Sequence, residues 1–166
     1  MDDAEAPSER SGIWICPACG ARLVSRNLWH SCGRYSLENL FAKADPGSLE
    51  LARTYVAVLH TLGDVQVLPQ KTRLVCVARV RFSGLEPRKY GFLANFALHR
   101  WLDSSRVAKT VDYGPRWRVH YVRVRSEADV DDELIAWLQE SHVGVQIDLR
   151  GAPEIAAQTD RLDSPP

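Results

Sequence analysis

Apolar residues recur at spacings of three and four from Leu49 onward, a pattern typical of an amphipathic helix. Asp45 and Pro46 stand at its expected start, where an aspartate caps free N–H groups and a proline loses no helical hydrogen bond. Gly63 follows the last apolar position and predicts the end of this helix. A shorter helical segment of one or two turns is predicted to begin at Ser36.

Apolar and polar residues alternate through the middle of the chain, as they do in β-strands that bury one face. This alternation predicts strands at residues 65–69, 71–82, 91–100 and 116–125. The intervening SGLEPRKYG contains glycine and proline and predicts a turn. The residues between the last two strands predict a longer connection.

The last part of the patterned region predicts a helix and then a strand. Ser126 and Asp129 have the spacing of a capping box ahead of a helix that runs to about Gln139. Residues 143–149 (VGVQIDL) are compatible with a short final strand. Helices before and after a run of hairpin-connected strands indicate an α+β fold, in which helices flank one face of an antiparallel sheet of about four strands.

The two faces of the predicted sheet differ in their side chains. Apolar residues such as Leu74 and Phe82 are expected to face the helices. The opposite face then carries Arg73, Arg79, Arg81, Asn95, His99, Tyr121, Arg123 and Arg125. Arginine and aromatic side chains on an open sheet can hold phosphates and stack bases, which favours nucleic acid as a partner. Exposed strands need polar residues in any protein, so a plain solvent-facing surface stays open as the alternative.

The 166-residue chain has a net charge of zero, but the charges are unevenly distributed. Residues 70–125 hold 13 lysines and arginines and three acidic residues, a local net charge of +10. Residues 126–140 reverse the sign with six acidic residues and no basic one. Such a dipolar surface attracts an anionic partner locally. A codon bias of the genome is an alternative explanation for the excess of 17 arginines over four lysines.

A cysteine-rich segment precedes this region. Cys16 and Cys19 have the C-x2-C spacing of a metal-binding knuckle, and His30 and Cys32 follow. Three thiolates and one imidazole suit Zn²⁺, so the sequence predicts one zinc ion. A segment of about 20 residues cannot reach stability by burial alone. Metal binding would contribute roughly 10–16 kcal/mol to ordering it.

The predicted zinc site is structural rather than catalytic. Four protein ligands complete a tetrahedral site and leave no position for a reactive water. The zinc-deaminase signature, H-x-E followed by P-C-x-x-C, is absent. Glycine-rich phosphate loops and hydrolase motifs are absent as well. The sequence contains no recognisable catalytic constellation and favours a binding protein over an enzyme.

The pattern divides the chain into four parts. We expect a disordered acidic tail over 1–12, a zinc-ribbon or knuckle-like finger over 13–35, an α+β domain over 36–149 and a disordered tail over 150–166. The apolar runs are too short to cross a bilayer, and the acidic start lacks the features of a secretory signal. A cytoplasmic protein without a membrane partner is therefore expected.

The segments WICPACG, WHSCG, LGDVQVLPQKTRLVCVARVRF, GFLANFALHR and VHYVRVRSEADVDDEL resemble the bacterial proteins grouped as domain of unknown function 5655. The resemblance extends over about residues 13–145 and implies a compact α+β domain behind a short zinc finger. It implies the metal ligands Cys16, Cys19, His30 and Cys32. It also implies a shared polar cluster of Lys71, Thr72, Arg100 and His120. No established activity comes with this resemblance.

These patterns leave three functions open. The first is recognition of an anionic partner, most simply nucleic acid, through Lys71, Thr72, Arg73, Arg79, Arg81, Arg100, His120, Arg123 and Arg125. The second is a small-anion pocket, in a binding domain or an enzyme, formed near Lys71, Thr72, Arg100 and His120. The third is an adaptor that docks onto another protein through the acidic helix. His120 also fits the alternative role of a hydrogen-bonded core histidine.

Overall fold

The computed structural model describes residues 13–147 of the chain. Its strands are β1 (Trp14–Ile15), β2 (Arg22–Leu23), β3 (Gln66–Pro69), β4 (Leu74–Val77), β5 (Arg81–Pro87), β6 (Phe92–Leu98), β7 (Val107–Asp112) and β8 (Arg118–Val124). Its helices are α1 (Leu37–Leu40), α2 (Pro46–Thr61) and α3 (Asp132–Ile147), with a short 3-10 turn, η2 (Glu127–Asp129), before α3. The two tails expected at 1–12 and 150–166 lie outside the described residues.

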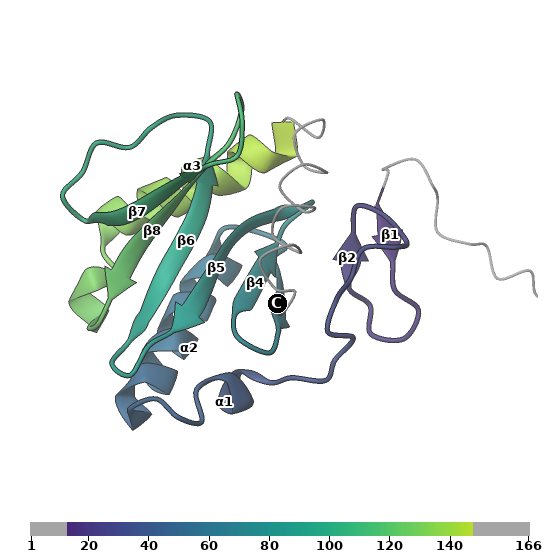
Figure 1. Cartoon of the computed structure of the whole chain (residues 1–166), viewed down its shortest axis with the longest axis horizontal. Coiled ribbons are helices and arrows are strands. Elements are labelled where there is room, and N and C mark those ends of the chain that lie inside the picture. Colours follow the sequence, from purple (N-terminus) through teal and green to yellow (C-terminus); the bar gives the residue numbers. More distant parts are fainter. Residues whose placement is uncertain (1–12, 148–166) are drawn as a thin grey trace, which may run out of the picture.

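The larger sheet is antiparallel throughout, with the strand order β3-β4-β5-β6-β8-β7. Strands β1 and β2 pair separately in the finger. Helices α2 and α3 both lie behind the larger sheet in Figure 1, so they cover the same face. The architecture is therefore α+β, as predicted, but the sheet has six strands instead of about four.

Two predicted boundaries in the first half of the sheet are wrong. The single strand expected over 71–82 is the hairpin of β4 and β5, because the chain reverses at residues 78–80. The segment expected to be a turn supplies most of β5 instead. Gly84 belongs to this strand because the carbonyl oxygen of Leu74 would lie only 2.4 Å from a Cβ at that position. The glycine permits close pairing and does not mark a turn.

Two further predictions fail in the second half. The expected long connection before β8 contains β7, which forms one edge of the sheet. Residues 143–147 of the expected final strand continue α3 instead, and residues 148–149 lie outside the described part. The helix continues because Leu138, Ser141 and Val145 recur at helical spacing and are all buried.

The helix signals in the sequence are largely confirmed. Asp45 caps α2 by accepting a hydrogen bond of 3.1 Å from the N–H of Gly47. The expected capping box of Ser126 and Asp129 is present, although it begins η2, three residues ahead of α3. Local hydrogen bonds of this kind depend on few neighbours, which makes helix starts readable from sequence.

Aromatic side chains dominate the core between the helices and the sheet. Tyr55 of α2 packs against Phe92 with ring centroids 5.2 Å apart, and its hydroxyl lies 2.9 Å from that of Ser83 on β5. Phe96 of β6 stacks on Trp137 of α3 at 5.7 Å. Both helices thus anchor to the same face of the central strands, which leaves the opposite face for other contacts.

Candidate metal centre and basic groove

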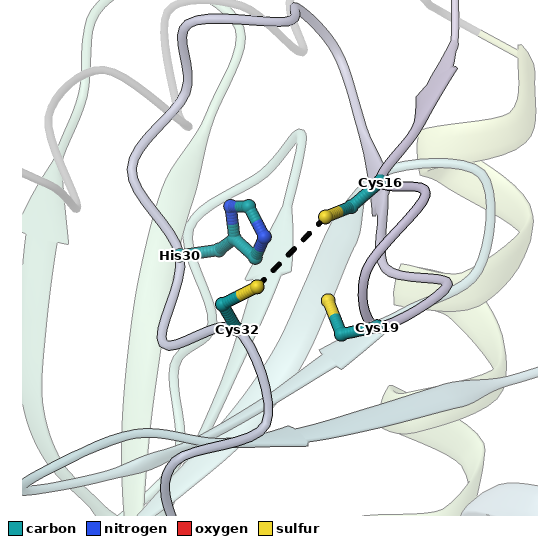
Figure 2. Close-up of side chains that lie close together, drawn as sticks. All are labelled: Cys16, Cys19, His30 and Cys32. Atoms are coloured by element: carbon teal, nitrogen blue, oxygen red, sulfur yellow. Dashed lines mark hydrogen bonds between the residues drawn. The ribbon is translucent and has the colours of Figure 1, made fainter.

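Four side chains of the finger converge on one point. Cys16 follows β1, Cys19 ends the next turn, and His30 and Cys32 come from the loop after β2. Their ligand atoms all lie within 4.8 Å of one another, and Figure 2 shows the side chains pointing toward a common centre. The structure therefore brings together all four predicted metal ligands.

The spacing of these ligand atoms fits a tetrahedral ion. Zinc–sulfur distances of about 2.3 Å at tetrahedral angles place two sulfurs about 3.8 Å apart. The Sγ atoms of Cys16 and Cys32 are 3.9 Å apart. The donor set of three sulfurs and one ring nitrogen is the type that zinc prefers in structural sites.

The backbone around the ligands supports the same interpretation. The Nδ1 atom of His30 lies 3.3 Å from the carbonyl oxygen of Leu28, while its Nε2 is buried without a hydrogen-bond partner. An N–H at Nδ1 that donates to this carbonyl leaves the Nε2 lone pair for a metal. Cys32 has a φ of 50°, which only a strongly restrained non-glycine residue adopts.

The thiols also shift each other's proton affinity. Burial raises the pKa of Cys16, but the N–H groups of Ala18 and Cys19 and the ring of His30 stabilise its thiolate and lower the pKa to about 6. Hydrogen bonds with the sulfurs of Cys16 and Cys19 raise the pKa of Cys32 to about 11. A cation bound among the sulfurs would offset the repulsion that also raises the pKa of Cys32.

The finger is attached to the larger sheet through Gln66 of β3. The side-chain amide of Gln66 donates to the carbonyl of Gly20 at 2.7 Å, and its oxygen accepts from the backbone N–H of Arg22 at 2.8 Å. The Arg22 guanidinium also pairs with the exposed carboxylate of Asp64 at 2.6 Å. The segment directly after the Cys16–Cys19 turn is thus fixed beside the sheet.

The histidine-containing loop makes a second attachment to the same strand. The hydroxyl of Ser31 donates to the carbonyl of Pro69 at 2.7 Å, and Leu68 packs against the apolar cluster of the finger. Since β3 is an edge strand, its outer backbone groups would otherwise be free to pair with another chain. The finger therefore lies beside the β3 edge of the sheet, on the right in Figure 1, and satisfies one of its carbonyl groups.

The basic residues predicted near β4 do not form one site. Lys71 and Thr72 are exposed in the turn between β3 and β4, and Arg79 is exposed in the turn between β4 and β5. Arg73 and Arg81 are half-buried and already have interaction partners. These residues are spread over both ends of the hairpin.

Arg100 and His120, expected to accompany Lys71 and Thr72, lie elsewhere. Arg100 forms two hydrogen bonds of 2.8 Å with Glu140 of α3. His120 is fully buried, and its Nε2 accepts from the N–H of Leu102 at 3.1 Å. Because β8 lies three strands away from β4, about 14 Å of sheet separates His120 from the Lys71–Thr72 turn. The structure does not bring these four residues together.

The face opposite the helices is only partly open. The register pairs Asn95 with Tyr121 on this face, and Leu93 with Arg123. Tyr121 is only 5% exposed, because the Lys109 ammonium lies 4.7 Å from its ring centroid and other side chains surround it. Burial raises the pKa of Tyr121 to about 12. His99, expected on the same face, instead packs on the ring of buried Trp117 at 4.0 Å.

A basic groove lies at one end of this face. Its volume is about 520 Å³, and its lining contains no acidic side chain. The cationic residues in the lining are Arg88, Lys89, Lys109, Arg123 and Arg125. Aromatic and apolar residues, with Tyr90 the most exposed, complete it. Only Arg123 and Arg125 of this set were predicted from the sequence.

The groove concentrates positive charge that residues 13–147 leave largely unpaired. Arg88 pairs with Glu86 at 3.0 Å. The other four cations form no salt bridge with any residue of the described range 13–147. Arg106, by contrast, reaches both Asp131 and Glu133 across the molecule. Unpaired like charges repel each other, and an anion bound among them would relieve that repulsion.

Two local features place cations in the groove. Gly91 (φ 70°) brings the Arg88–Gly91 turn against the end of β8, where a Cβ would lie 2.0 Å from the carbonyl oxygen of Val124. The register of β7 places Lys109 opposite Tyr121, on the face away from the helices. A bulge between Val107 and Lys109 adds Ala108, which also lines the groove.

The main chain of the Arg88–Gly91 turn is held in place by the start of α2. The N–H of Gly91 donates to the hydroxyl of Ser48 at 2.7 Å. The N–H of Asp45 donates to the carbonyl of Lys89 at 2.9 Å. The cations of this turn therefore extend from a fixed backbone, which lowers the entropy lost when they bind a partner.

No helix in the described part of the chain is long and apolar enough to span a membrane. Comparisons of the chain with protein-family models, with curated proteins and with solved structures give no match in any of the three.

Proposed function

We propose that this protein binds one structural zinc ion in its finger and recognises nucleic acid through the basic groove. The observation that supports recognition best is a group of four cations that surround an exposed tyrosine and form no salt bridge within the described part of the chain. Phosphate contacts supply most of the affinity of such proteins, and they come from lysine and arginine side chains. A cytoplasmic location, where thiols stay reduced, fits this proposal.

The zinc ion would be held by Cys16, Cys19, His30 and Cys32. Zinc attracts and orients these four groups and thereby supplies the cohesion that a small finger lacks. Membership of the domain of unknown function 5655 family is also proposed, and the ligand spacing of the finger supports it. Neither proposal gives the protein a reaction to catalyse.

The groove fits nucleic acid better than the alternatives drawn from sequence. A small-anion pocket was expected to join Lys71 and Thr72 to His120, but these residues lie far apart. An adaptor would need free acidic side chains on α3, whereas Glu133 and Glu140 pair with Arg106 and Arg100.

Binding can be tested by fluorescence anisotropy with labelled DNA and RNA oligonucleotides at several salt concentrations. We expect affinity to fall steeply as salt rises, because phosphate contacts release counterions. Arg123→Glu should abolish binding at moderate salt and reduce the steepness of the salt dependence. Arg79→Glu is the matched control, since Arg79 is equally charged and exposed but lies at the other end of β5.

Two outcomes would contradict the proposed function. One is the absence of binding to every oligonucleotide at low salt. The other is an equal loss of affinity in the Arg79→Glu and Arg123→Glu variants, because the attraction would then come from overall charge and not from the groove.

A further inference from the structure

We infer that the groove binds single-stranded nucleic acid, with an unpaired base stacked on the ring of Tyr90. This inference rests on the proposed function and specifies the form of nucleic acid that the groove recognises. It follows from the exposure of Tyr90, the rigidity of its turn and the positions of the surrounding cations.

Tyr90 presents an unusually free aromatic ring. It is 61% exposed, more than any other large hydrophobic side chain among the described residues. The Lys89 ammonium lies 5.2 Å from the ring centroid, a distance at which a cation and a ring attract each other. Tyr121, the aromatic residue expected to stack bases, is buried and cannot do so. Tyr90 is therefore the ring in the groove that a base can reach.

The turn beneath Tyr90 holds the ring in place. Its neighbours Lys89 and Gly91 are hydrogen-bonded to Asp45 and Ser48 at the start of α2. A backbone hydrogen bond of 3.1 Å from Arg88 to Gly91 closes the turn itself. An aromatic ring on a fixed turn can stack on a base without first losing much conformational freedom.

The cations lie where the backbone of a stacked nucleotide would continue. Lys109 and Arg123 project from the sheet face next to the turn, and Arg125 follows the end of β8. A base on Tyr90 would thus have its flanking phosphates near positive charges. This combination of an aromatic platform and a basic channel is how proteins bind single strands with little sequence preference.

A duplex cannot use Tyr90 in the same way. Its bases are stacked on each other, so their flat faces are not available to a protein ring. The cations can still contact duplex phosphates, but the ring then adds nothing to the affinity. The inference therefore predicts that a single strand binds more tightly than the duplex of the same sequence. General attraction to polyanions does not predict this preference.

The test compares a short single-stranded oligonucleotide with the duplex of the same sequence, using anisotropy with DNA and with RNA. We expect at least one of the two single strands to bind more tightly than its duplex. Tyr90→Ala should weaken single-strand binding about 5- to 100-fold, the range that corresponds to loss of one stacked base. Tyr90→Phe should retain most of the affinity, because the ring remains.

Trp101→Ala is the matched control for this experiment. Trp101 is exposed to a similar degree, 58%, but it follows the opposite end of β6. Its removal should leave binding unchanged. If Tyr90→Ala binds like the unchanged protein, or if duplex and single strand bind equally, the inference is overturned. Loss of binding in Arg123→Glu would then still support the proposed function, whereas no effect of Arg123→Glu would contradict both.

Discussion

The finger and the larger domain bury apolar surface on different scales. The buried cluster of the finger consists of Cys16, Ala21 and Leu23 alone. The domain fully buries large side chains such as Trp117 and Phe92 between its helices and its sheet. Burial stabilises in proportion to apolar area, so the domain can fold by burial, whereas the finger would draw its stability from the proposed metal. The difference also separates their roles, because the candidate metal ligands of the finger would serve its cohesion, while four of the five groove cations form no salt bridge with the described residues.

Removing one metal ligand should give the largest effect and should affect the finger alone. In Cys19→Ser we expect zinc content to fall from one ion per chain to nearly none. The finger then loses most of the roughly 10–16 kcal/mol that zinc contributes to ordering such a segment. Elemental analysis measures the metal, and amide NMR spectra should show unfolded finger signals beside native signals of the β4–β8 strands.

Cys76→Ala is the matched control for that experiment. Cys76 is a cysteine that is completely buried in the domain core, and burial raises the pKa of its thiol. Its replacement should leave the zinc content at one ion per chain. A Cys19→Ser protein that still carries one zinc, or that unfolds throughout, would contradict the division between the two regions.

A core truncation should give the converse result. Leu85 is fully buried on β5, so Leu85→Ala leaves a cavity and should lower the free energy of unfolding of the domain by about 2–5 kcal/mol. Zinc content in the native protein should not change. Urea denaturation followed by circular dichroism gives the stability, and loss of zinc from the folded variant would show that the finger depends on the domain.

The parts of this structure that sequence predicts well are those fixed by near neighbours. The four candidate metal ligands lie within 17 residues of one another, and their spacing predicts the cluster that the structure contains. The same is true of α2, where Asp45 and Pro46 mark the start. The reversal at residues 78–80 escapes prediction because Ala78 and Val80 continue the alternation, with no glycine or proline to show the turn.

The groove escapes prediction for a different reason. Its cations come from the β5–β6 turn, β7 and the end of β8, which meet only after the sheet has formed. Lys109 reaches the groove because β7 pairs it with Tyr121 of β8, a register that its local sequence does not reveal. A basic turn, Arg88–Lys89, was the available signal, but it reads as an ordinary solvent-facing loop. Sites assembled across strands depend on register, and register is the least local property of a sheet.

The attachment between the two regions can be weakened without destroying either. Gln66→Ala removes both hydrogen bonds from β3 to Gly20 and Arg22, which should destabilise docking of the finger by about 1–3 kcal/mol. Hydrogen exchange at the Arg22 amide should become faster, with zinc content unchanged. Gln139→Ala, an exposed glutamine on α3, is the control and should leave this exchange rate as it is.

Mild acid should give the smallest effect and should act on the domain through its buried histidines. Burial lowers the pKa of His120 and of His142 below the ordinary value near 6.5. The unfolded chain therefore takes up more protons below about pH 6.5, so this stability is present above that pH and is lost as pH falls through the folded pKa values. This loss of stability is the smallest of the predicted effects, because it is complete only at a pH below the folded pKa values of both histidines.

The urea midpoint of unfolding, followed at β8 amides, should fall between pH 7 and pH 5.5. It should fall equally in His60→Gln, whose histidine is exposed. A midpoint that stays constant would show that the domain accommodates charged histidines in its core.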